Sequence, residues 1–219
     1  MDLTVLYKLT YGLYVVGAFK DGRAVGCVVN TCFQITSDTP RVAVSINKNN
    51  FTLEAIRDNG RFSLSIVAED TDPSIIGRFG FMSSRDMDKY DGFGFDVVGY
   101  VPCVKGRFSG RLILEAEQMV DCGTHMLVIA RLTDTLQGSG EPMTYAYYHR
   151  VIKGKAPKNA PTYRAEEDSA PAGDSRKRRF ECDICHYVAE TDGADLPDGY
   201  VCPICGADVS HFKELDAAE

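Results

Sequence analysis

Several features that would assign this 219-residue chain to a common class of protein are missing from its sequence. No stretch approaches the roughly 18 to 20 consecutive apolar residues that a membrane-spanning helix needs. The first residues, MDLTVLYKLTYG, lack the basic segment and the cleavage site of a secretory signal. No G-x-G-x-x-G motif and no glycine-rich phosphate loop occurs, so a Rossmann site for a dinucleotide is not supported. We therefore expect a soluble, cytoplasmic protein that does not bind a membrane.

The length and the distribution of charge predict one full domain, a linker and a small terminal module. Residues 1–156 carry 17 acidic and 17 basic residues, residues 157–179 carry 4 and 6, and residues 180–219 carry 10 acidic residues and one base, Lys213. The middle segment has three prolines and no apolar periodicity, which is typical of a flexible linker. The last segment would repel phosphates, so nucleic acid is excluded as a partner for it.

Runs of apolar and β-branched residues predict that the first domain is mainly β. Asp21-Gly22 separates two such runs and is the signature of a tight hairpin. Residues 50–60 begin with a polar residue and end with Gly60, the pattern of a short capped helix. The runs cover residues 12–19, 23–30, 33–37, 41–47, 62–67, 111–121 and 125–136, of which the last two are close enough to pair. Many short strands with few helices favour a barrel or a sandwich over a doubly wound sheet.

The eight cysteines fall into two groups. Four are scattered through the first domain and are typical of small buried apolar side chains. The other four form two C-x-x-C pairs with 16 residues between them, namely Cys182, Cys185, Cys202 and Cys205. In a cytoplasmic chain such pairs indicate a metal site rather than disulfides. Four thiolates suit a tetrahedral zinc or iron ion, and the spacing alone does not choose between the two metals.

The residues around these pairs resemble rubredoxin, over about 36 residues. The matching segments are CDICHYV at 182–188 and LPDGYVCPICGA at 196–207, with Phe212 beyond them. The resemblance implies one redox-active iron, with aromatic residues corresponding to Tyr187, Tyr200 and Phe212 packed beneath it. His186 occupies a position where the family usually has glycine, and a positive φ is disfavoured for histidine. The stretch between the pairs is also shorter than in free-standing rubredoxins, and a structural zinc ribbon is the alternative.

Polar side chains are concentrated just before the helix expected at 50–60. One phosphate could be held by Lys48, Thr52 and the free amides at the start of that helix. A polar ring edge or a ribityl chain could be bound by the side chains of Asn30, Thr31, Gln34 and Ser45. Ordinary strand ends and a helix cap would explain the same residues, so the residues alone leave both interpretations open.

The first domain as a whole resembles the flavin reductase-like family over about residues 5–163. The matching segments are GLYVVGA, DGR, GCVVNTCFQIT and VSINKNNFT, followed by RFGF, SRD, GTH and the stretch from MTY to GKAP. The resemblance implies a split β-barrel that binds FMN, in a homodimer with each FMN pocket near the subunit interface. By motif position the FMN ligands are Asn30, Thr31, Gln34, Ser45, Asn47, Lys48 and Thr52. His125 and Lys155 are further candidates near the isoalloxazine or an incoming nicotinamide, although His125 is equally well explained as a structural histidine.

The two resemblances together match the domain order of the high-molecular-weight rubredoxins. They imply electron transfer from NAD(P)H to FMN, then to the four-cysteine iron, and on to a redox partner such as a flavodiiron oxygen or nitric oxide reductase. This relay needs no catalytic acid or nucleophile. One alternative is an NAD(P)H:flavin reductase with a structural zinc ribbon. The other is a non-catalytic FMN-binding protein whose terminal module recruits partners.

Overall fold

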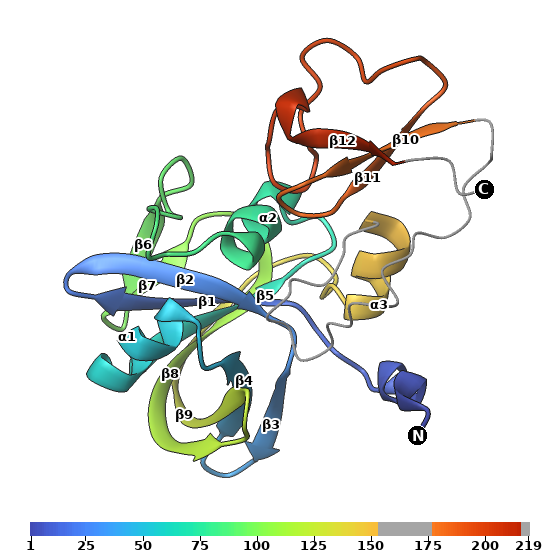
Figure 1. Cartoon of the computed structure of the whole chain (residues 1–219). Coiled ribbons are helices and arrows are strands. Elements are labelled where there is room, and N and C mark those ends of the chain that lie inside the picture. The colour runs from blue at the N-terminus through green and yellow to red at the C-terminus, as the bar shows by residue number, and fades with distance from the viewer. Residues whose placement is uncertain (153–176, 216–219) are drawn as a thin grey trace.

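A curled seven-stranded antiparallel sheet forms the body of the first domain (Figure 1). The structure is a computed structural model that describes residues 1–152 and 177–215; the expected FMN ligand Lys155 and most of the expected linker lie outside these residues. In spatial order the strands are β2 (Arg23–Val29), β1 (Tyr14–Lys20), β5 (Arg61–Val67), β8 (Phe108–Asp121), β9 (His125–Gln137), β4 (Arg41–Asn47) and β3 (Cys32–Thr36). The predicted mainly β fold is confirmed, and the seven strands curl into a barrel.

Local sequence signals explain how the sheet turns and bends. β1 and β2 are joined by Asp21 and Gly22, whose φ angles of 50° and 77° suit a two-residue hairpin turn. β8 pairs with β9 as predicted, and its register shifts between Ile113 and Leu114 and again between Ala116 and Gln118. Such bulges increase the local twist, so the two longest strands can follow the curvature of the barrel.

Two nine-residue helices lie on the first domain. α1 (Phe51–Asn59) begins after Asn50, whose side chain accepts from the Thr52 amide, and ends at Gly60 with φ 70°. Both caps are those that the sequence predicts. α2 (Pro73–Phe81) begins after Asp72 and was not predicted. The first domain also contains the hairpin of β6 (Phe95–Val98) and β7 (Val101–Val104), a short 3-10 turn at Leu3–Lys8, α3 (Tyr145–Tyr147) and the π-helical turn Tyr148–Ile152. A second short 3-10 turn, Val209–His211, belongs to the C-terminal module.

Two apolar clusters stabilise the first domain. One fills the barrel beneath α1, with Val16, Val44, Leu53, Phe62 and Leu64 among its fully buried members. The other lies beneath α2 and contains Ile75, Ile76, Phe79, Phe108 and Tyr148. None of the helices in the described ranges is both long and apolar enough to cross a lipid bilayer.

The C-terminal module is a three-stranded sheet in the order β11 (Val188–Thr191), β10 (Arg178–Cys182) and β12 (Phe212–Leu215). β10 begins two residues before the boundary expected at residue 180: Arg178 is aligned with Thr191 of β11, and its guanidinium pairs with the Glu214 carboxylate of β12. α2 lies between this module and the barrel (Figure 1). The second apolar cluster and the metal-binding module therefore share one helix as a neighbour.

Candidate metal centre and cofactor pocket

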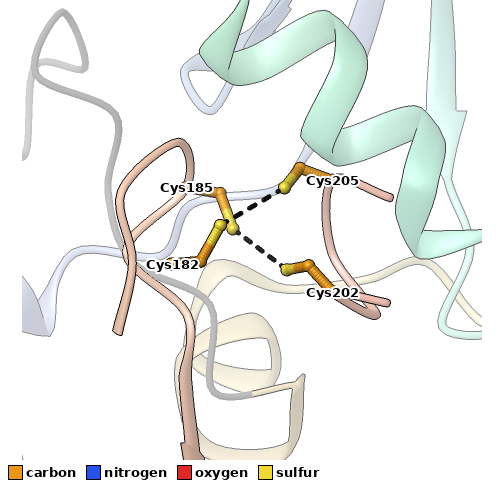
Figure 2. A group of neighbouring side chains, drawn as sticks. All are labelled: Cys182, Cys185, Cys202 and Cys205. Carbon is orange, nitrogen blue, oxygen red and sulfur yellow. Dashed lines mark hydrogen bonds between the residues drawn. The ribbon is translucent and has the colours of Figure 1, made fainter. Parts of the chain in front are cut away.

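The two C-x-x-C turns bring four sulfur atoms together. We call residues 182–185 the first knuckle and residues 202–205 the second knuckle. The Sγ atoms of Cys182 and Cys205 lie 3.6 Å apart, and those of Cys185 and Cys202 lie 3.4 Å apart (Figure 2). All four sulfurs lie within 4.8 Å of one another, and all four residues are buried. The grouping predicted from the spacing is confirmed.

The donor set fits one tetrahedral metal ion. Metal–sulfur bonds of about 2.3 Å in a regular tetrahedron place the sulfurs about 3.8 Å apart, close to the separations found here. Four soft thiolates with no oxygen or nitrogen ligand suit iron or zinc. A site closed by four protein ligands has no position for a substrate, so a bound metal can transfer electrons or stabilise the fold but cannot activate water.

The two knuckles have matching backbone hydrogen bonds. The His186 amide donates to the Cys182 carbonyl at 2.8 Å, and the Gly206 amide donates to the Cys202 carbonyl at 2.9 Å. His186 and Gly206 both adopt positive φ, at 60° and 74°. The expected left-handed histidine is therefore present, and its Nδ1 lies 3.1 Å from Oε1 of Glu181. The contact with Glu181 helps to hold the His186 side chain at a positive φ, a backbone conformation in which glycine would be less strained.

The electrostatics of the cluster favour a cation at its centre. Hydrogen bonds from the Cys185 and Cys205 thiols, together with backbone amides, hold the pKa of Cys202 well below its usual range. The pKa of Cys185 is raised by its hydrogen bonds to Cys202 and Cys205 and by burial. Four buried thiolates would repel one another, so a bound metal ion is needed to hold all four deprotonated.

Aromatic side chains surround the cluster. Tyr187 and Phe212 pack against the buried cysteines. Tyr200 packs edge-on against Phe212, with ring centroids 5.3 Å apart. The three aromatic residues expected from the rubredoxin resemblance are thus grouped at the centre, and they keep it in an apolar environment that influences its potential.

A pocket opens in the first domain where β2, β4, the start of α1 and the end of α2 meet. Its wall combines amide, hydroxyl and apolar side chains with one lysine. This mixture suits a planar heteroaromatic ring with a polar edge, because apolar side chains cover the ring faces and a few polar groups fix its orientation. The lining residues are Val28, Val29, Asn30, Ser45, Asn47, Asn49, Asn50, Phe51, Phe79, Gly80, Phe81, Met82, Ser83, Ser84, Lys89, His125 and Tyr145.

Four of the residues predicted to bind FMN line this pocket, namely Asn30, Ser45, Asn47 and His125. Lys48 follows Asn47 and pairs with Asp121. The Thr31 hydroxyl donates to Oδ1 of Asn30 at 3.0 Å. The roles assigned to Thr31 and Lys48 stay predictions.

The other predicted ligands lie in different surroundings. Gln34 is exposed on β3, where its side-chain amide donates to the Thr36 carbonyl at 2.9 Å. The Thr52 side chain is completely buried, and its backbone amide is already bound by Asn50. A ligand role for either residue stays a prediction, and Lys155 lies outside the described residues.

Lys89 and the end of α2 were not among the predicted site residues. Lys89 is only 3% exposed, and its ammonium donates to the carbonyls of Gly26 at 2.9 Å and Phe79 at 3.0 Å. Burial lowers the pKa of Lys89 to about 8. The segments RFGF and SRD within the family resemblance were the available signal for this wall, because Phe79, Phe81 and Ser84 all belong to them.

The pocket and the four cysteines both adjoin α2. Phe81 lines the pocket and also packs against the cysteine cluster. Figure 2 shows the same helix running beside Cys205. The arrangement can therefore bring a bound planar cofactor and a bound metal close together without a long intervening segment.

Comparison with known proteins agrees with this two-part architecture. Residues 6–155 match the flavin reductase like domain family. The chain is 42% identical to the high molecular weight rubredoxin of Moorella thermoacetica, over 98% of this chain and all of that protein. It is 38% identical to a ferric-chelate reductase (NAD(P)H) of Archaeoglobus fulgidus, over 74% of this chain and 98% of that protein.

A solved structure supports the fold of the first domain. An FMN-binding protein of Thermus thermophilus is similar with a TM-score of 0.55 at 23% identity, over 60% of this chain and 74% of that chain. The match to the flavin reductase family, the four-cysteine cluster and the full-length relative agree with one another. The chain belongs to the high-molecular-weight rubredoxins, in which a flavin reductase-like domain precedes a rubredoxin module.

Proposed function

We propose that this chain is an NAD(P)H-dependent oxidoreductase that passes electrons from bound FMN to a four-cysteine iron centre and then to a redox partner. The observation that carries the proposal is that the amide-lined pocket and the four-thiolate centre both adjoin α2 and share Phe81. The names of the relatives support it, because one is a reductase that uses NAD(P)H and one is a rubredoxin. The Thermus protein of similar fold binds FMN.

The pocket residues have defined tasks toward FMN. The side chains of Asn30, Ser45 and Asn47 offer the hydrogen-bonding groups that a flavin edge requires. Phe81 and Tyr145 supply an apolar wall that excludes water from the ring. Lys48 is the candidate phosphate ligand and would have to exchange Asp121 for the phosphate. His125, at the first residue of β9, is the candidate neighbour of the isoalloxazine or the nicotinamide.

The two cofactors supply the redox chemistry when they are bound. FMN accepts a hydride, which is two electrons and one proton, and can release electrons singly, whereas a four-thiolate iron carries one electron between its ferric and ferrous states. The protein holds both groups, keeps water from the flavin and places no acid or nucleophile in an essential role. Two successive one-electron transfers to the iron therefore account for each nicotinamide oxidised.

The terminal acceptor and the oligomeric state form a finer part of the proposal. The module carries exposed carboxylates at Asp183, Glu190, Asp192, Asp195 and Asp198. Such a surface suits a fast and weak encounter with a basic patch on a redox partner, for which a flavodiiron reductase is our candidate. A homodimer with FMN near the subunit interface is proposed from the family.

An anaerobic absorption spectrum tests the relay directly. The purified full chain should show flavin and ferric-thiolate bands together, and NAD(P)H should bleach both. Zinc with no ferric-thiolate band would favour the flavin reductase with a zinc ribbon. Failure of both NADH and NADPH to bleach the flavin would instead favour an FMN-binding protein that does not oxidise nicotinamide.

Replacing Cys205 with serine separates the two halves of the relay. The change removes one of four thiolates, so the ferric-thiolate band and electron delivery to a downstream protein should be lost. Reduction of FMN by nicotinamide should continue, because Cys205 is not in the wall of the pocket. Cys122→Ser is the matched control, since Cys122 is exposed and lies outside the cluster. Unchanged delivery by Cys205→Ser would refute the order of the relay.

A further inference from the structure

We infer that α2 is the docking surface on which the chain holds its own rubredoxin module, and that Gly77 is the positioning residue that makes this contact possible. The inference rests on the proposed electron transfer and says where it takes place. The contact is defined by Gly77 on α2 and by Ile204 and Cys205 in the second knuckle. It places the metal centre beside the wall of the flavin pocket in the same chain.

Gly77 is needed because the knuckle backbone touches the helix directly. A Cβ atom added at Gly77 would lie 2.0 Å from the carbonyl oxygen of Ile204 and 2.5 Å from the Cα of Cys205. Both distances are far inside van der Waals contact, and both involve backbone atoms that cannot rotate away. Any side chain at this position would therefore push the second knuckle off the helix. A glycine in the middle of a helix costs stability, so its presence here is explained by the close approach.

Apolar side chains extend the contact on both sides of Gly77. Phe81 packs against the cysteine cluster and lines the pocket, so one side chain touches both sites. Ile152 packs against the cysteine cluster and against the cluster beneath α2. These contacts remove apolar surface from water and stabilise the docked position without fixed charges.

A second aromatic connection joins the same two sites. Tyr145 lines the pocket, and its ring stacks on that of Tyr148 with centroids 6.1 Å apart and planes 14° apart. Tyr148 is 1% exposed, and its hydroxyl is buried with no hydrogen-bond partner in the described part of the chain. Tyr148 belongs to the cluster beneath α2, and Ile152 joins that cluster to the cysteines. Side chains of the cluster beneath α2 therefore contact both the pocket wall and the cysteine cluster.

The docked arrangement makes reduction of the iron a reaction within one chain. Return of the reduced flavin to FMN would release two electrons, one at a time, and one proton to solvent. Each electron would convert a bound ferric ion to ferrous, and the second would follow after the redox partner has reoxidised the iron. The rate of the first transfer should then be independent of protein concentration. Displacing the second knuckle should slow this step while the pocket continues to accept hydride.

The test uses Gly77→Ala and Gly77→Gln in the full chain. Both residues favour the helix more than glycine does, so α2 itself should not be weakened. The overpacked contact should lower the equilibrium constant for docking about tenfold to a hundredfold, which is about 1.4–2.8 kcal/mol at about 1.4 kcal/mol for each factor of ten. Gly193→Ala is the control, because an added Cβ there meets its nearest atoms at 3.4 Å in an exposed part of the module.

Two readouts are compared in the wild-type and variant proteins. Hydrogen–deuterium exchange should be faster in α2 and in residues 202–207 of the Gly77 variants and unchanged in β8 and β9. Anaerobic stopped-flow mixing with NAD(P)H should show unchanged flavin bleaching and at least a tenfold slower reduction of the iron.

The outcomes separate the two proposals. If the wild-type iron is not reduced although the flavin bleaches, the relay itself is wrong. If the wild-type iron is reduced and the Gly77 variants match it in rate, or show no change in exchange, the assignment of α2 as the docking surface is overturned and the relay stands. Slower iron reduction with faster exchange in both segments supports the inference.

Discussion

The buried lysine behind the pocket gives a prediction whose sign and size follow from the structure. Lys89 is enclosed between β2 and α2, and its ammonium bonds to the carbonyls of Gly26 and Phe79. Burial lowers its pKa from 10.5 to about 8, and the buried Cys27 thiol is the nearby titratable group that acts on it. Burying the charged ammonium of Lys89 therefore lowers the free energy of unfolding, because the same group is fully hydrated in the unfolded chain.

The dependence on pH follows from proton linkage. Between pH 8 and 10.5 the unfolded chain holds a proton on Lys89 that the folded chain has released, so the free energy of unfolding rises with pH. The difference of 2.5 between the two pKa values corresponds to about 3 kcal/mol, at about 1.36 kcal/mol for each pKa unit. The destabilisation by protonated Lys89 is therefore fully present below pH 8 and disappears above pH 10.5. The neutral amine still has two N–H groups, so both carbonyls keep their donor.

Lys89→Met isolates this effect, because methionine has similar length and no charge. The difference in unfolding free energy between wild type and variant should change by about 2–3 kcal/mol between pH 7 and pH 10, in favour of the wild type at high pH. Guanidinium unfolding of the full chain, followed by far-UV circular dichroism, measures it. Lys105→Met is the control, since the Lys105 side chain is 58% exposed and its ammonium pairs with an exposed carboxylate, that of Asp96, at 3.4 Å. Parallel pH profiles for wild type and Lys89→Met would refute the buried-charge argument.

Two further predictions concern single contacts at the two sites. Lys48→Ala should weaken FMN binding roughly tenfold to a hundredfold in a fluorescence titration, because a charge-assisted contact to phosphate is lost. Asp121→Asn, which frees Lys48 from its ion pair, should not weaken FMN binding. Unaltered affinity in Lys48→Ala would remove this lysine from the site. His186→Gly should relieve left-handed strain and raise the stability of the iron module by about 1 kcal/mol, while Gly206→Ala at the matching position of the second knuckle should lower it by a similar amount. Equal midpoints of iron loss for these variants and the wild type would show that the Glu181 contact and the metal absorb the strain.

Local signals in the sequence were sufficient for much of the fold. The Asp21-Gly22 turn, the Asn50 and Gly60 caps of α1 and the pairing of β8 with β9 each depend on residues close together in the chain, and each was predicted. α2 had a signal of the same kind that was not used, because Asp72 followed by proline is a typical helix start.

The site residues also differ in whether a local pattern in the sequence indicates them. The four cysteines were found because a metal imposes their spacing, which is short within each knuckle. Lys89 was missed because nothing near it in the sequence shows that it is buried against carbonyls of two other elements. Gly77 was missed for a similar reason, since its partner at Cys205 lies in another domain and a glycine within a helical segment has no unique meaning.

The contact with α2 and the charge of the module favour different kinds of encounter. The docked face is apolar, formed by Gly77, Phe81 and Ile152 against the second knuckle, and salt affects such a contact little. The carboxylates of Glu190, Asp192, Asp195 and Asp198 belong to a separate segment of the module and are exposed. Charges in that position can attract a basic partner over about 8 to 10 Å at ordinary ionic strength while the second knuckle stays on the helix. Under the proposed relay, the module would receive electrons through the internal contact with α2 and deliver them through a transient external contact, because different residues of the module serve each step.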